Sequence, residues 1–216
     1  MKLFDRYSRI ATVTVIALAA ASAHADVSTE TWSPCGSSEG VNSKGLFSAL
    51  VTYSYSSGST ASVSIVLNNT TLLANGGYIT GLAVNQAAGT TGMSFVSCTN
   101  SNFLAISAFS APPFGTFTAG GALGADWIGG GSPIDGIAAG SFATFNFSIT
   151  GSSAVLAAID ASSVFGPNID GNAMAVRFRG GVGDDWSDKV LGCPAPAPGA
   201  VALLGVAGLL GSRRRR

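Results

Sequence analysis

The sequence predicts an all-β protein, an antiparallel β-sandwich or jelly-roll-like domain set between two targeting segments. Three observations support this prediction. Several short segments alternate apolar and polar side chains with a period of two, which places one face of each strand on a core and the other in water. Glycine-rich turns separate these segments, and no 15-residue stretch of the central region follows a helical period. Several such strands without long helices favour a sandwich.

The alternation predicts the strands in order along the chain. It is clearest in four segments, residues 51–56, 61–67, 144–150 and 174–179. Less regular patterns predict two or three more strands in two further segments, residues 78–85 and 93–109. Residues 154–163 are compatible with a short helix. The Gly- and Pro-rich stretch at 111–141 is expected to be a long connection or a decorated edge.

Charge divides the 216-residue chain into three regions, residues 1–25, 26–192 and 193–216. The two ends hold seven of the eleven basic residues. The central region holds ten acidic and four basic residues, which gives it a net charge of −6. Its length suits one domain with its own core. Nucleic-acid binding needs a basic surface, so no nucleic-acid partner is expected.

Residues 1–25 have the pattern of a secretory signal peptide: a basic start, a short apolar stretch, and small residues at Ala23 and Ala25. This pattern predicts cleavage by signal peptidase after Ala25. The alternative is an uncleaved membrane anchor, for which the apolar stretch is short. The single histidine, His24, leaves with the leader. A Ser-His-Asp relay is therefore not expected in the mature protein, and a zinc site lacks a common ligand.

The last 24 residues form a proline-rich spacer, an apolar segment at 200–211 and a terminal arginine cluster. The spacer and cluster residues are Pro194, Ala195, Pro196, Ala197, Pro198, Gly199, Arg213, Arg214, Arg215 and Arg216. Proline fixes φ and lacks an N–H, so the spacer is expected to be non-helical. An apolar helix followed by basic residues stops in a membrane with its basic end in the cytoplasm. The segment therefore predicts a short transmembrane helix.

This arrangement resembles the PEP-CTERM sorting signal, whose pattern is a Pro-Glu-Pro motif, a hydrophobic helix and an arginine cluster. The resemblance covers about a tenth of the chain. It implies cargo of an exosortase, a membrane-embedded enzyme that cuts near the motif and releases or re-anchors the protein at the cell surface. It also implies association with exopolysaccharide. The motif here is Pro-Ala-Pro without the glutamate, which indicates a variant class. The alternative, a plain membrane anchor, leaves the proline spacer unexplained.

A loop late in the central region carries three carboxylates, Asp184, Asp185 and Asp188. It follows residues 180–183, which match the start of the calcium-binding repeat G-G-x-G-x-D. Ca²⁺ prefers oxygen ligands, so a calcium- or glycan-binding adhesin is one alternative function. The repeat occurs once here, whereas the motif works by stacking copies. A solvated loop without metal is therefore the competing interpretation.

Three other sequence patterns are similar to known catalytic or metal-binding motifs. Residues 36–40 match the nucleophile elbow G-x-S-x-G but have no histidine to act as base. Residues 168–172 carry oxygen donors at alternate positions, but Arg179 stands where an EF-hand needs glutamate, so a turn is expected. A carboxylate-dependent polysaccharide hydrolase, an unlikely alternative, needs two paired acids. The candidate acids are Glu30, Glu39, Asp126, Asp135, Asp160 and Asp170.

The three cysteines are Cys35, Cys98 and Cys193. Export favours a disulfide, and three pairings are possible. We expect Cys35–Cys98, because Cys193 borders the spacer outside the predicted domain. The alternatives are three free thiols, or a bond through Cys193 that ties the ends of the domain together.

The sequence as a whole predicts an exported, non-enzymatic surface or extracellular-matrix protein. Its expected processing partners are signal peptidase and an exosortase-type enzyme. It is expected to associate with exopolysaccharide. It is expected to be anchored transiently in the inner membrane by its C-terminal helix. No cofactor is predicted unless the aspartate loop binds calcium.

Overall fold

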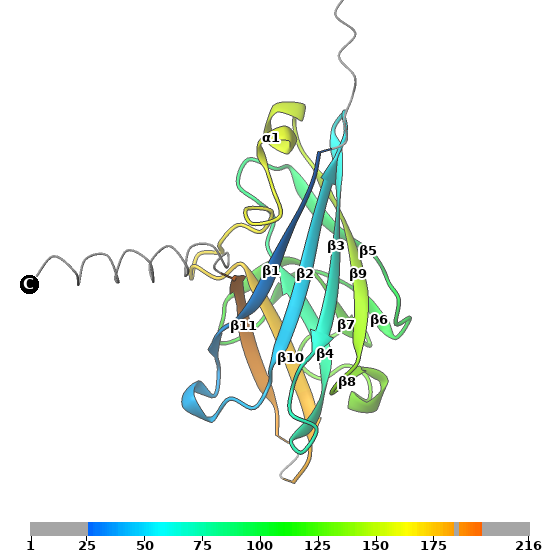
Figure 1. Ribbon diagram of the computed structural model, residues 1–216, viewed down its shortest axis with the longest axis vertical. Helices are drawn as coiled ribbons and strands as arrows, with labels where there is room; N and C mark the ends of the chain where they lie inside the picture. Colours follow the sequence, from blue (N-terminus) through cyan, green and yellow to red (C-terminus); the bar gives the residue numbers. More distant parts are fainter. Residues whose placement is uncertain (1–25, 184–185, 196–216) are drawn as a thin grey trace, which may run out of the picture.

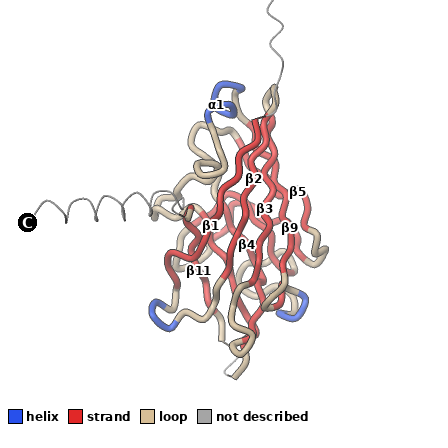
Figure 2. Tube along the Cα trace, viewed as in Figure 1, coloured by secondary structure: helices blue, strands red, loops and turns tan. Residues whose placement is uncertain are grey.

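The computed structural model describes residues 26–183 and 186–195. Strands dominate these residues (Figure 2), which also form the α-helix α1 (Ser153–Ala158) and the 3-10 turns η1 (Gly40–Asn42) and η2 (Pro133–Asp135). The strands are β1 (Asp26–Ser37), β2 (Phe47–Tyr55), β3 (Thr60–Asn69), β4 (Gly76–Val84), β5 (Gly92–Cys98), β6 (Phe103–Ser110), β7 (Thr116–Leu123), β8 (Ile137–Ala138), β9 (Phe142–Thr150), β10 (Met174–Gly181) and β11 (Asp188–Pro194). The predicted all-β class is confirmed.

All these strands belong to one antiparallel sheet, in the order β5-β9-β3-β2-β1-β11-β10-β4-β7-β6, with the short β8 paired to β4. The first and last strands of this order, β5 and β6, are consecutive in the chain and lie close together, so the sheet curls until it nearly closes. Figure 1 shows β2, β3 and β9 in front of β4 and β7. The two layers expected of a sandwich are thus halves of one curved sheet.

The main core fills the inside of this curl. In β3 and β9 every second residue from Ala61 to Leu67 and from Ala143 to Ile149 is buried, as the alternation predicts. Phe103 and Phe145 meet edge to face with ring centroids 5.0 Å apart, a favoured aromatic geometry. The largest fully buried side chains of this core include Trp32, Tyr53, Phe145, Phe147 and Phe178. Burial of such apolar surface is the main favourable contribution to folding.

The prediction for residues 111–141 was wrong in part, because this stretch contains the core strand β7 as well as loop structure. β7 pairs with β4 on one side and β6 on the other. The loop after β7 folds over the outer face of β4 and β10 and brings Trp127 into a second apolar cluster. The buried members of this cluster are Ala83, Ala111, Phe114, Phe117, Trp127 and Ala175.

Two local predictions are confirmed. The short helix expected within residues 154–163 is present as α1, although it ends at Ala158, and its first turn is capped by the Ser152 hydroxyl accepting the Val155 N–H at 3.3 Å. Residues 168–172 form a turn, in which the Asn168 side-chain oxygen accepts two backbone N–H groups at 2.9 Å each. Asn168 also donates to the Phe114 carbonyl at 2.7 Å, which fastens the turn to the neighbouring loop.

The first and last described strands, β1 and β11, were not predicted. They pair with each other in the middle of the sheet, with a bulge between Pro34 and Gly36. β11 continues to Pro194, and the Ala195 N–H still donates to the Thr31 carbonyl at 2.7 Å. The sheet therefore extends past residue 192, the predicted end of the domain, into the proline spacer.

The targeting predictions lie almost entirely outside the described residues. These are the leader at 1–25 with Ala23 and Ala25, the spacer at 196–199, the apolar segment at 200–211, and the arginine cluster at 213–216. Asp184 and Asp185 also lie outside them. Within the described ranges, no helix has both the length and the apolar character to cross a membrane.

Candidate functional site

The outer face of the front layer carries two rows of small side chains, which are polar except for Val27. The same alternation that buries one side of β2, β3 and β9 turns hydroxyl and amide groups outward on the other. Strand register aligns these groups across five strands. The first row is Thr29, Thr52, Ser64, Asn146 and Ser97, and the second is Val27, Ser54, Ser62, Ser148 and Ser94. We call these two sets the hydroxyl rows.

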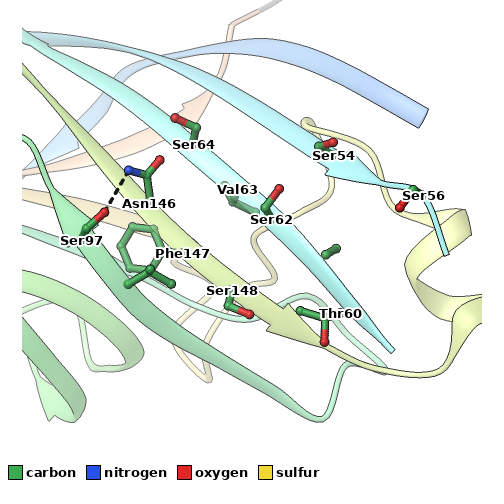
Figure 3. Close-up of a pocket in the computed structure, with 12 residues that line it drawn as sticks. Ser54, Ser56, Thr60, Ser62, Val63, Ser64, Ser97, Asn146, Phe147 and Ser148 are labelled. Carbon is green, nitrogen blue, oxygen red and sulfur yellow. Dashed lines mark hydrogen bonds between the residues drawn. The ribbon is translucent and has the colours of Figure 1, made fainter. Parts of the chain in front are cut away.

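Six members of the hydroxyl rows line a depression of about 630 Å³ over β2, β3, β9 and β5 (Figure 3), namely Ser54, Ser62, Ser64, Ser97, Asn146 and Ser148. The Asn146 amide donates to the Ser97 hydroxyl at 3.1 Å, which links β9 to β5 on this face. The remaining hydroxyls are presented to the solvent side of the strands. The lining residues are Ser54, Ser56, Thr60, Ala61, Ser62, Val63, Ser64, Val96, Ser97, Asn146, Phe147 and Ser148, none of which is charged.

The chemistry of this depression suits recognition of neutral polar groups. Each hydroxyl both donates and accepts hydrogen bonds, and the Asn146 amide does the same through separate atoms. Strands about 4.8 Å apart and same-face residues about 6.8 Å apart give a regular grid of such groups. Phe142, which is 64% exposed, stands on the same outer face of β9 at its start and offers an apolar ring surface.

The hydroxyl rows cannot be recognised in the sequence alone. The alternation places the outward residues of each strand in water, which is correct for a single strand. Their alignment depends on which strands are neighbours, and β3 pairs with β9 across more than 70 residues of chain. The signal present in the sequence was the near absence of charge at these outward positions.

The aspartate loop is described only at Asp188, which is 1% exposed. One carboxylate oxygen accepts the Ser37 hydroxyl at 2.6 Å. The other accepts the Ser43 hydroxyl at 2.7 Å and the N–H groups of Lys44 and Gly45 at 3.2 Å each. Asp188 therefore has protein donors on both oxygens and holds the η1 loop against β11. No group of three metal-ligating side chains gathers within residues 26–183 and 186–195.

The expected Cys35–Cys98 disulfide is wrong, because the structure joins Cys35 to Cys193 with their Cα atoms 5.8 Å apart. Cys193 is not outside the domain but in β11, beside β1. Cys35 is the extra residue of the β1 bulge, and bulges re-aim a side chain. The bond is solvent-exposed and ties the two ends of the domain together, so the alternative pairing through Cys193 is the one found.

Cys98 is a free thiol at the end of β5, partly buried against the core. Burial raises the pKa of this thiol to about 11, and the backbone N–H groups of Asn100 and Thr99 oppose that shift. At neutral pH the sulfur is therefore protonated and unreactive, since the thiolate is the nucleophile.

No family model, curated protein or solved structure matches this chain. The structure itself indicates the type of fold and the type of compartment. The fold is a near-closed antiparallel sheet with an uncharged polar outer face. The interstrand disulfide is typical of a protein from an oxidising compartment, the periplasm or the extracellular space.

Proposed function

We propose that this protein is an exported, non-enzymatic surface or matrix protein that binds neutral exopolysaccharide through the hydroxyl rows. The observation that carries the proposal is the uncharged grid of hydroxyl and amide groups across five neighbouring strands. A neutral sugar presents hydroxyls at similar density and needs partners that both donate and accept. Phe142 adds an exposed ring against which the apolar face of a sugar can pack.

Binding of this kind is weak per sugar and gains strength from repetition. A neutral hydrogen bond exchanged with water contributes about 0.5–1.5 kcal/mol. A polysaccharide offers many identical units, and a surface crowded with copies of the protein engages several at once, which raises avidity. Because the depression has no charged lining residue, its affinity is expected to depend little on salt.

Export and attachment belong to the same proposal. Signal peptidase is expected to remove the leader. An exosortase is expected to process the C-terminal tail, because the tail resembles PEP-CTERM signals. The disulfide supports an oxidising destination. The domain then stands at the cell surface or in the matrix, where polysaccharide is available.

The binding test uses affinity electrophoresis of the mature protein in gels containing neutral polysaccharides. Ser64→Ala with Asn146→Ala is expected to weaken binding about tenfold, the effect of losing roughly 1.4 kcal/mol of hydrogen bonding. The matched control, Ser101→Ala with Ser132→Ala, removes exposed polar groups elsewhere and is expected to change nothing. Equal retardation of both variants, or no retardation of the wild type by any neutral polysaccharide, contradicts the binding proposal.

The attachment test is the intact mass of the native protein, measured together with its distribution between membrane and medium. A C-terminus between Cys193 and Gly199, on protein found at the surface or in the medium, supports sorting with cleavage. A full-length C-terminus retained in the inner membrane contradicts it. In that case the tail is a plain anchor and the domain faces the periplasm.

A further inference from the structure

Two arginines stand side by side on the opposite half of the sheet, away from the hydroxyl rows. Arg177 and Arg179 are two residues apart in β10, and both project from its outer face, since Val176 and Phe178 point into the main core. The loop that follows β7 covers them. Arg177 is 8% exposed, whereas Arg179 is only partly buried.

The partners that the structure gives these guanidinium groups are uncharged. Arg177 donates to the Trp127 carbonyl, and Arg179 donates to the Gly130 and Gly131 carbonyls at 2.9 and 3.3 Å. Within the described residues, the buried Nε of Arg177 has no hydrogen-bond partner. Buried arginines are ordinarily paired with an anion, because an uncompensated buried charge is costly. The two guanidinium groups therefore place two positive charges close together, and the N–H on Arg177 Nε has no acceptor among the described residues.

The electrostatics agree with an uncompensated pair. Burial, and after it the positive charge of Arg179, lower the pKa of Arg177 to about 10, and the Asp126 carboxylate opposes this shift. The Asp126 carboxylate itself accepts the Ile128 N–H at 2.8 Å, so it is engaged within its own loop. A negative group between the two arginines would relieve their mutual repulsion.

Beside the arginines is a pocket of about 160 Å³, lined by Pro133, Arg177, Arg179, Gly180 and Ser187. Among the described residues, its lining includes two cations and a hydroxyl and no acidic side chain. The volume is below the roughly 300–1,000 Å³ of sites that enclose a drug-sized ligand. It suits one charged group rather than a length of chain.

We propose that this pocket binds a single oxyanion group, a carboxylate, sulfate or phosphate, between Arg177 and Arg179. Guanidinium groups match such anions in geometry and stay charged at neutral pH. The Ser187 hydroxyl supplies a further donor at the rim. This site does not rest on the polysaccharide proposal, because it lies on other strands and takes a ligand of opposite character.

The experiment titrates the mature protein with sodium sulfate, phosphate or glucuronate, with sodium chloride holding ionic strength constant. Binding is followed by calorimetry and by tryptophan fluorescence, since Trp127 and Trp186 adjoin the arginines and Ser187. Saturable binding of at least one anion is expected, and the anion that binds tightest identifies the source. Arg179→Gln is expected to weaken it at least tenfold and Arg179→Lys less. Lys44→Gln removes an exposed positive charge from a neighbouring depression that shares only Ser187 with this pocket, and it is expected to weaken binding far less than Arg179→Gln.

Several results overturn the inference. One is a response no larger than that to chloride, and another is equal binding by Arg179→Gln and Lys44→Gln. If Arg179→Gln lowers the melting temperature, Ser187→Ala provides the second readout, and unchanged affinity there counts against the site. Binding seen only in Asp184→Asn with Asp185→Asn shows that the chain's own carboxylates neutralise the arginines, which also overturns it. The retardation of Arg179→Gln by neutral polysaccharide is measured in parallel. Because the arginines lie away from the hydroxyl rows, this measurement distinguishes a failure of the anion site from a failure of the proposed function.

Discussion

At the scale of single residues, Asp188 shows how one buried carboxylate fixes the position of a loop. Its two oxygens accept four hydrogen bonds from the segment between Ser37 and Gly45. The donors include two backbone N–H groups that have no strand partner of their own. Because the carboxylate is charged, each bond is stronger than its neutral counterpart. The segment after β1 is therefore anchored to the start of β11.

Replacing Asp188 with alanine is expected to lower the free energy of unfolding by about 3 kcal/mol, because four donors lose a charged acceptor in a buried site. Urea denaturation followed by tryptophan fluorescence measures the change. Asp135→Ala is the matched control, since that side chain is exposed. Its unfolding free energy is expected to stay within about 0.5 kcal/mol of the wild type. Equal stability of the two variants would show that Asp188 does not hold the loop.

The Cys98 thiol gives a pH prediction at the same scale. Its pKa is raised to about 11, so at pH 8 the folded protein holds far less thiolate than the unfolded chain. Alkylation by iodoacetamide is expected to be about 100-fold slower in the folded state, in proportion to the thiolate fraction. Mass spectrometry of Cys98 peptides follows the rate. It should keep rising tenfold per pH unit beyond pH 9, and a plateau near pH 9 in the folded protein would contradict the shift.

At the scale of elements, β7 shows why some strands could be predicted and others could not. β2, β3, β9 and β10 bury alternate large residues and were found from sequence. β7 contains Gly120 and Gly121, which are typical of turns. The structure explains them: a Cβ on Gly120 would lie 2.4 Å from the Leu82 carbonyl oxygen, and one on Gly121 would lie 2.8 Å from the Phe95 ring.

β1 and β11 were missed for a related reason. β1 has one fully buried side chain, Trp32, and a bulge beside Pro34. β11 turns Asp188, Val190 and Gly192 inward, a set that carries little apolar signal. Their place in the sheet depends on pairing with β2 and β10, and the local pattern of apolar and polar residues does not predict that pairing. The hydroxyl rows escaped prediction in the same way, because only register brings their members together.

Gly120→Ala is expected to destabilise the protein by about 2–3 kcal/mol, since the added methyl group meets backbone that cannot move aside without disturbing the β4–β7 pairing. Gly129→Ala is the matched control, because a Cβ there meets its nearest atom at 3.9 Å. Thermal melts of the two variants measure the difference. A melting temperature for Gly120→Ala equal to that of the control would show that β7 packs less closely than described.

At the scale of the whole molecule, the Cys35–Cys193 bond joins positions 158 residues apart and so encloses nearly the entire domain. Cross-linking so distant a pair restricts the unfolded chain strongly, and loop-closure entropy sets an upper estimate of about 5 kcal/mol. The sequence predicts export and a disulfide among the three cysteines, but it does not identify the partner of Cys35. That choice depends on β11 lying beside β1, which is a property of the completed sheet.

Cys35→Ser with Cys193→Ser is expected to lower the unfolding free energy by about 2–4 kcal/mol. Denaturant titration of oxidised wild type and variant measures the loss. Cys98→Ser serves as the control, since it removes a thiol that takes no part in the bond. Peptide mapping without reduction tests the pairing directly, and a Cys35–Cys98 peptide would contradict the described fold.

The position of the disulfide also decides how the domain bears tension. A force applied to the chain at Ala195 is transmitted directly to Cys193, because only Pro194 lies between them. The covalent bond passes that load to Cys35 in β1, which is held on both sides by β2 and β11. The hydrogen bonds between β11 and β10 are then spared from peeling. Reduction of the bond moves the point of failure to β11 and lets the domain unzip from its C-terminal strand at a lower force.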